Sequence, residues 1–182
     1  MIARLRLTLL ALLLVLTVLM AIRSCRSREA AEAPPPAGPD SASVGMRAAL
    51  LWFASPTGDS LVTEARELPD QADAHTRVAA LVAALDQGPR EAGVRTLPQG
   101  TLVLHVFLDE SGLLTLDLSR QFRQGFLGGA RAEELAVGSL VRTLAANVPE
   151  AKHIRIVCAG VALSSLGGHF PLDQPLDPED WP

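Results

Sequence analysis

The strongest constraint on this chain is an apolar run at its N-terminal end. The run from Leu7 to Ile22 is broken only by two threonines. With Arg4 and Arg6 extended towards the lipid headgroups, the apolar span approaches the ~20 residues that a helix needs to cross a bilayer. A cleaved signal peptide needs small residues at its cleavage site, and this run leads into Arg-Ser-Cys-Arg instead. We therefore predict an uncleaved transmembrane signal anchor over residues 1–23, with a cleaved signal peptide as the alternative.

The residues that flank the anchor leave its orientation and processing open. Arginines lie on both sides of the run, so the positive-inside rule gives no clear orientation. A single span at the start of the chain favours a domain on the extracytoplasmic side. Ile22 lies three residues before Cys25, as in a lipidation motif, but Arg23 stands where a small residue is expected. Lipidation of Cys25 is therefore a further alternative.

Composition divides the rest of the chain into three parts. Residues 24–45 are rich in Ala, Pro, Ser and Gly, a composition that cannot bury enough apolar surface to fold. We predict a flexible linker there. Residues 46–176 carry the helix and strand patterns and are predicted to form the folded domain. Residues 177–182 are acidic and proline-rich and are predicted to be a flexible tail.

Hydrophobic periodicity predicts the elements of the folded domain. Helical spacing runs through residues 71–87 and 130–148, and the first helix should stop at Gly88-Pro89. The β patterns occupy five segments: 47–53, 101–108, 113–118, 154–158 and 161–166. The order β-α-β-β-α-β-β predicts an α+β two-layer sandwich, with one mixed sheet and both helices on one face. The hairpin over 101–118 is apolar on both faces, so we expect it near the middle of the sheet.

Several classes of function are disfavoured by the residues present. The net charge is −4, tyrosine is absent, and no basic patch is interleaved with aromatic residues, so nucleic-acid binding is not expected. The four histidines lack the local pairing of metal ligands, and no nucleophile motif or P-loop occurs. We expect no metal, no cofactor, no catalytic residue and no small-molecule substrate.

Three features of the sequence can be interpreted either as structural or as functional. The stretch Ser55-Pro56-Thr57-Gly58-Asp59-Ser60 is either part of a reaction centre or a turn whose polar side chains cap the backbone. Asp117 lies near the end of an apolar strand and needs a partner, either a backbone N–H or an arginine such as Arg120 or Arg155. His169 follows two glycines after the last strand, and we consider it a candidate functional residue.

Short motifs in a fixed order resemble those of one family, the GerMN (Germane) domains. The motifs are LWFASPTGDSLVTEAREL at 51–68, AALVAALDQGP at 79–89, LPQGT at 97–101, Asp117-Leu118-Ser119, Gly128-Gly129 before Glu133-Glu134-Leu135, NVPEAK at 147–152, and Gly168-His169 before LDQPL at 172–176. The resemblance covers about residues 48–176. It marks Asp117, Ser119, Gly128, Gly129, Gly168 and His169 as hallmark positions. Ala130 departs from the pattern, because the family tends to have serine there.

The resemblance implies an α+β domain that looks like ring-building folds, on the outer side of a membrane, without catalytic activity. We therefore expect a membrane-tethered binding or assembly domain of the bacterial cell envelope. Its partners would be envelope proteins or a second copy, and a sporulation or germination role is implied by the resemblance alone. The alternative is binding or hydrolysis of peptidoglycan or other envelope glycans. That alternative requires Asp117, His169 and the 55–60 turn to meet in one pocket.

Overall fold

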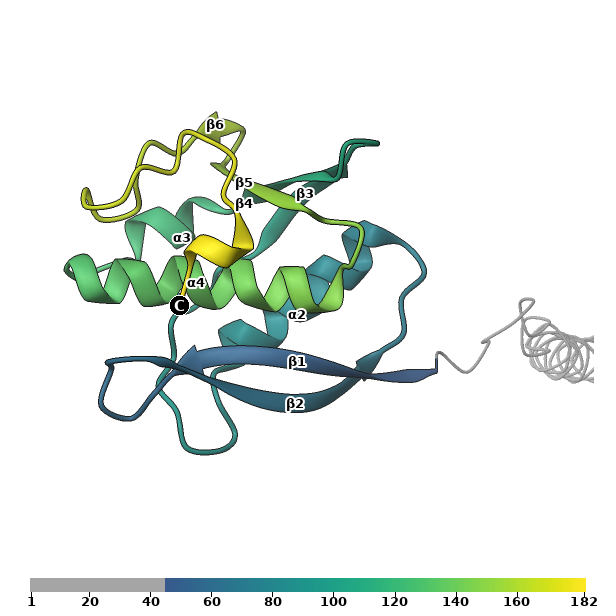
Figure 1. The fold of residues 1–182 in the computed structure, drawn as a ribbon, viewed down its shortest axis with the longest axis horizontal. Coiled ribbons are helices and arrows are strands. Elements are labelled where there is room, and N and C mark those ends of the chain that lie inside the picture. Colours follow the sequence, from purple (N-terminus) through teal and green to yellow (C-terminus); the bar gives the residue numbers. More distant parts are fainter. Residues whose placement is uncertain (1–44) are drawn as a thin grey trace, which may run out of the picture. The chain divides into compact units, whose positions relative to one another are not determined.

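A layer of helices lies between a two-stranded β-ribbon and a four-stranded mixed sheet (Figure 1). These elements come from a computed structural model, which describes residues 45–182. The predicted anchor, nearly all of the linker and Cys25 lie outside the described residues. Within residues 45–182, no helix has the length and apolarity that a membrane span requires.

The ribbon pairs β1 (Met46–Ala54) with β2 (Leu61–Pro69) in antiparallel register. The second sheet has the order β3-β4-β5-β6, in which the central pair is parallel and the outer pairs are antiparallel. Its strands are β3 (Val103–Leu108), β4 (Leu113–Leu118), β5 (His153–Cys158) and β6 (Val161–Ala162). The helices are α2 (Ala74–Gln87), α3 (Arg120–Gln124), α4 (Ala130–Asn147) and a 3-10 turn, η1 (Pro178–Asp180).

The predicted α+β class and mixed sheet are confirmed. The difference is that β1 belongs to a separate two-stranded sheet on the other side of the helices. The first strand does not join the mixed sheet, because residues 61–69 fold back and pair with it instead. The sequence analysis missed this second strand, because two of its inward positions are the charged residues Glu64 and Arg66. The final strand is also shorter than predicted, since only Val161 and Ala162 pair with β5.

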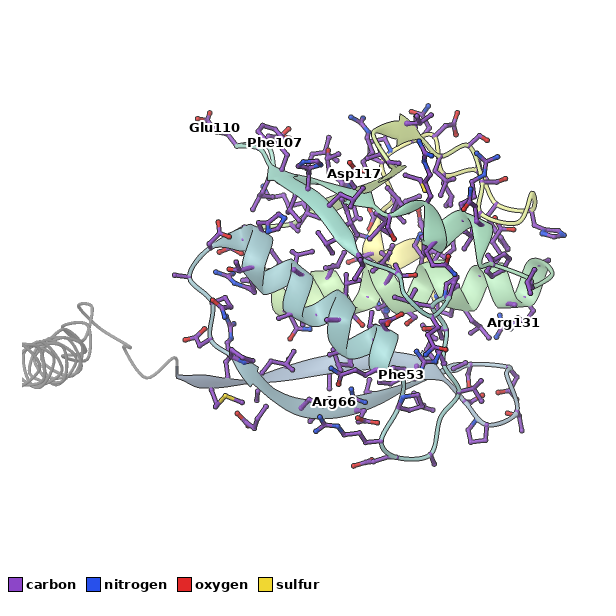
Figure 2. All side chains as sticks on the ribbon, turned by 180° about the vertical axis from the view of Figure 1, so that it is seen from behind. Phe53, Arg66, Phe107, Glu110, Asp117 and Arg131 are labelled. Atoms are coloured by element: carbon purple, nitrogen blue, oxygen red, sulfur yellow. The ribbon has the colours of Figure 1, made fainter. Side chains whose placement is uncertain are left out.

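The hairpin of β3 and β4 is not central as a whole. β4 lies between two strands, and its inward leucines 114, 116 and 118 are fully buried. β3 lies at the edge of the sheet, and Phe107 is 66% exposed on the face away from the helices (Figure 2). The expectation that both strands are covered on both faces was therefore wrong for β3.

Both predicted helical stripes form the core between the layers. On α2, the residues at the predicted spacing are buried: Val78, Leu81, Val82 and Leu85. Asp73 caps the start of α2 by accepting a hydrogen bond from the Thr76 amide (2.9 Å). Gly88 ends the helix with a positive φ of 82°, as the predicted Gly-Pro stop requires.

A second stripe on α4 is polar and closes the free edge of β1. Asn147 accepts a hydrogen bond from the Leu50 amide (3.0 Å) and donates one to the Leu50 carbonyl (2.7 Å). Thr143 accepts from the Trp52 amide (3.0 Å), and Ser139 donates to the Trp52 carbonyl (2.6 Å). These residues recur every four positions on one helix face, so α4 takes the place of a neighbouring strand.

A buried ion pair ties β2 to the end of α2. Arg66 donates to Glu64 (2.5 Å), to the Ala84 carbonyl in α2 (2.9 Å) and to the carbonyl of the C-cap residue Gly88 (2.6 Å). The other Glu64 oxygen accepts from the backbone amides of residues 90 and 91. The Arg66 guanidinium also lies 5.2 Å from the ring centre of Phe53, and Figure 2 labels both side chains between ribbon and helix. Both charged side chains of this buried pair are therefore hydrogen-bonded.

Replacing Asn147 by alanine tests the polar stripe on α4. The Asn147→Ala variant leaves the Leu50 amide and carbonyl without their partners, so we expect unfolding to become easier by about 1–3 kcal/mol. Chemical denaturation of the purified protein measures this change. The control is Gln124→Ala, which removes an exposed amide that makes no side-chain hydrogen bond within residues 45–182 and should change stability by less than about 0.5 kcal/mol. Equal effects of the two substitutions would contradict the role of the stripe.

Candidate functional site

The hydroxyl cluster at residues 55–60 forms the turn between β1 and β2. The hydroxyls of Ser55 (2.8 Å), Thr57 (2.8 Å) and Ser60 (3.0 Å) all donate to one oxygen of Asp59. These three donors lower the pKa of Asp59 from its ordinary value. Gly58 supplies the positive φ of 71° that the turn needs. The Ser55 hydroxyl also accepts from the amides of Asp59 and Ser60, so the cluster serves the turn.

Asp117 fixes the turn between β5 and β6. Its side chain is nearly buried, and one oxygen accepts a hydrogen bond from the Gly160 amide (3.0 Å). The other oxygen lies 3.2 Å from Nδ1 of His105 on the neighbouring strand. Neither arginine proposed as its partner forms an ion pair with it in residues 45–182. The partners of this carboxylate are therefore a backbone amide and a histidine.

Ser119 joins the end of β4 to the start of the β3 segment. Its hydroxyl accepts from the Leu102 amide (3.1 Å), and its own amide donates to the Leu102 carbonyl (2.8 Å). Ser119 lies at the N-terminal cap of α3, but its side chain makes no capping hydrogen bond.

His169 and Glu133 form a latch between α4 and the loop that follows β6. Glu133 is completely buried and accepts hydrogen bonds from the amides of Leu166 and His169 (each 2.9 Å). Nδ1 of His169 lies 2.9 Å from the same carboxylate oxygen as its own amide. The sequence analysis named Glu133 only as part of the motif Glu133-Glu134-Leu135. Its long-range role was missed, because nothing near it in sequence indicates burial.

Two of the hallmark glycines have a clear steric or backbone reason. A Cβ at Gly128 would clash with Ala132 and the Phe126 ring, so a side chain there would push the helix start away from its loop. Gly168 has a φ of 94°, which L side chains rarely adopt. By contrast, Gly129 precedes α4 without a capping side chain and has open space around it.

A groove lies where three loops meet at one end of α4. It has a volume of about 570 Å³ and combines parts of the 55–60 turn, the 94–98 segment and the 125–128 loop. Its apolar wall includes Val94, Leu97, Pro98, Phe126, Leu127 and Leu135. Leu127 is 96% exposed, which is unusual for a leucine in an ordered loop. We call this surface the Leu127 groove.

The charged groups of the Leu127 groove are two arginines, Arg95 and Arg131. Arg131 donates to the Glu134 carboxylate and to the Asp59 carbonyl, so it joins α4 to the 55–60 turn (Figure 2). Arg95 donates to the Gln87 carbonyl at the end of α2 (3.0 Å). No carboxylate and no histidine lines the groove, so it lacks an acid–base pair.

The three features that the catalytic alternative requires lie in different places. The 55–60 turn borders the Leu127 groove, whereas neither Asp117 nor His169 lines it. Asp117 holds a β-turn, and His169 binds Glu133. Within residues 45–182, no cluster of three or more metal-ligating side chains is present.

Comparison with known families gives a match over most of the folded part. The Germane family model, described as sporulation and spore germination, matches residues 50–164. The chain belongs to the Germane family. The family resemblance drawn from the ordered motifs is thus confirmed, and the Germane domain accounts for the segment from β1 to the residues just after β6.

Solved structures share this Germane fold. The tandem GerMN domains of the sporulation protein GerM from Bacillus subtilis have a TM-score of 0.61 at 18% identity, over 74% of this chain and 47% of that chain. The present chain therefore matches about half of that tandem protein. The separate structure of the first GerMN domain of that protein has a TM-score of 0.57 at 19% identity, over 74% of this chain and 99% of that chain.

A putative lipoprotein from Clostridium perfringens has a TM-score of 0.54 at 23% identity, over 76% of this chain and 92% of that chain. At these identities the solved structures show the fold alone. No curated protein matches this Germane domain.

The Glu133 latch makes a stability prediction with a defined pH dependence. Burial raises the pKa of Glu133, but the amides of Gly167, His169 and Leu166 and the His169 side chain outweigh it and lower the pKa overall. A lowered folded pKa means that the latch stabilises the domain fully above the unfolded carboxyl pKa, about 4.3. This contribution is lost as the pH falls through the lower folded value.

We expect Glu133→Gln to destabilise the domain at pH 7 by about 1–3 kcal/mol, because its amide nitrogen faces N–H donors. Urea denaturation between pH 7 and pH 3 measures both the loss and its pH dependence, which should be weaker in the variant. The matched control is Glu134→Gln on the same turn, whose partly exposed pair with Arg131 should contribute less than about 1 kcal/mol. A latch that carried no stability would give the two variants the same denaturation curves.

Proposed function

We propose that this Germane domain is a non-catalytic binding module of the bacterial cell envelope. Its predicted N-terminal anchor would tether it to the membrane, with the domain on the extracytoplasmic side. It would act by contact with other envelope proteins, in a process of the sporulation or germination type. The family match and the fold shared with a lipoprotein support this placement.

The observation that carries the proposal is the composition of the Leu127 groove. Exposed apolar side chains that line a hollow are typical of protein interaction sites, because their burial by a partner is favourable. Leu127 projects from its loop, so it is available to enter or cover an apolar partner surface. Arg95 forms no ion pair within the described residues, so it favours a partner segment that is apolar with an acidic flank.

The arrangement of carboxylates also favours binding over catalysis. Asp59 and Glu133 are surrounded by hydrogen-bond donors that lower their pKa values, so each stays ionised at neutral pH. A general acid for glycan hydrolysis needs a raised pKa and a second carboxyl group nearby. Glycan hydrolysis has less support for this reason, and no separate observation favours glycan binding.

Photo-crosslinking from the groove tests the proposal in living cells. A photoreactive residue at Pro98 should give a discrete crosslinked envelope protein, and adding Leu127→Asp should reduce that product about tenfold or more. Burial of an aspartate against an apolar partner explains the loss. A photoreactive residue at Val161, which is 65% exposed and does not line the groove, serves as the control and should not give this product.

The same experiment has results that would overturn the proposed function. Products recovered equally from positions 98 and 161 would show that the groove is not the contact surface. Recovery of glycan strands in place of a protein would support the alternative function. An unchanged amount of crosslinked product after Leu127→Asp would show that Leu127 is not part of the interface.

A further inference from the structure

A second, separate pocket is built around two aromatic rings. The rings of Phe170 and Trp181 lie 5.8 Å apart between centroids and are inclined by 58°. Both side chains are half-buried, and Trp181 packs against the hydrophobic core. They line a pocket of about 280 Å³ beside η1, which packs against α4 (Figure 1). The arrangement forms an aromatic corner.

Carboxylates complete the wall of this aromatic corner. Glu134, Asp177 and Asp180 line the pocket, and no lysine, arginine or histidine does. Glu134 is paired with Arg131, and one oxygen of Asp177 accepts from the Glu179 amide (2.9 Å). The side chain of Asp180 accepts no hydrogen bond from the described residues. The second Asp177 oxygen and the Asp180 carboxylate therefore remain as acceptors for a ligand.

A second arginine, Arg142, does not neutralise this pocket either. Arg142 on α4 donates to the Pro178 carbonyl (3.5 Å), beneath η1, but it forms no ion pair within the described residues and does not line the pocket. The carboxylates of Asp177 and Asp180 thus have no cationic partner within the described residues.

Aromatic faces attract cations, and carboxylates select cations that donate N–H hydrogen bonds. A quaternary ammonium group satisfies only the first requirement. A primary alkylammonium group satisfies both, and its methylene chain packs on the rings. We propose that the aromatic corner binds the lysine side chain of a partner protein.

The aromatic corner is distinct from the Leu127 groove and from the family match. The two surfaces share no lining residue. Apart from Glu134, every residue that lines the corner comes after residue 164, where the Germane match ends. Asp177, Asp180 and Trp181 also come after residue 176, where the ordered family motifs end, so these three residues of the site are not transferred from the family.

Tryptophan fluorescence reports directly on this site. The chain has two tryptophans, so Trp52→Phe leaves Trp181 as the sole emitter in the full-length protein. Titration with Nα-acetyl-lysine methylamide should change the emission with a saturable Kd on the order of millimolar, as a single side chain allows. The norleucine analogue, which has the same chain without the charge, should give no saturable change. The Nε-trimethyl analogue should bind at least about fivefold more weakly, since it lacks N–H donors.

Two charge-removing variants test whether lysine binding depends on the carboxylate of the pocket rather than on the overall charge of the protein. Asp180→Asn should weaken lysine binding about fivefold without altering the fold, because it keeps the shape of the side chain. Glu110→Gln removes one negative charge at the remote tip of the β3–β4 hairpin and should leave binding unchanged (Figure 2). Equal binding of the norleucine analogue, equal or tighter binding of the trimethyl analogue, or unchanged binding in Asp180→Asn would each overturn the proposal. A failure of the groove crosslinks would leave these results unaffected.

Discussion

The rest of this domain depends on the hydrogen bonds between the polar stripe of α4 and the edge of β1. A two-stranded ribbon is marginal by itself, because each strand has one edge without a partner. Ser139, Thr143 and Asn147 provide that partner for β1, and the stripe lies beside the apolar one that faces the core. The ribbon is thereby held against the helices, and the 55–60 turn at its end is placed next to the 125–128 loop. The Leu127 groove exists because of that placement.

Carboxylates in this domain serve as anchors for backbone segments. Glu64 holds the residues after α2, Asp117 holds the β5–β6 turn, and Glu133 holds the loop after β6. Each anchor accepts amide hydrogen bonds, and at Glu64 and Glu133 these bonds lower the pKa and favour the ionised form. The same use of charge explains how a sequence with few aromatic residues keeps long loops in fixed positions. None of these anchoring carboxylates lines the Leu127 groove, whose charged lining residues are Arg95 and Arg131.

Local patterns were sufficient to predict the elements whose burial repeats at a regular spacing. The apolar stripes of α2 and α4, the Gly88 stop and the hairpin of β3 and β4 follow from periodicity and turn chemistry. β2 was missed because Glu64 and Arg66 point inward, against the usual polarity of a strand. Asp117 was expected to need a partner, but a sequence cannot show that the partner is Gly160. The Glu133 latch and the Leu127 groove depend on residues far apart in sequence, so only the tertiary structure reveals them.

Amide hydrogen exchange at the two edges of the ribbon tests the central claim most directly. Leu50 and Trp52 lie opposite Ala65 and Thr63 in the ribbon. These are non-hydrogen-bonded pairs, in which the backbone N–H and C=O groups of both residues point away from the partner strand. The amides of Leu50 and Trp52 should exchange slowly, because Asn147 and Thr143 accept from them. The amides of Ala65 and Thr63, on the outer edge of β2, should exchange at least about a hundredfold faster. Comparable fast exchange on both edges would contradict the view that α4 completes the ribbon.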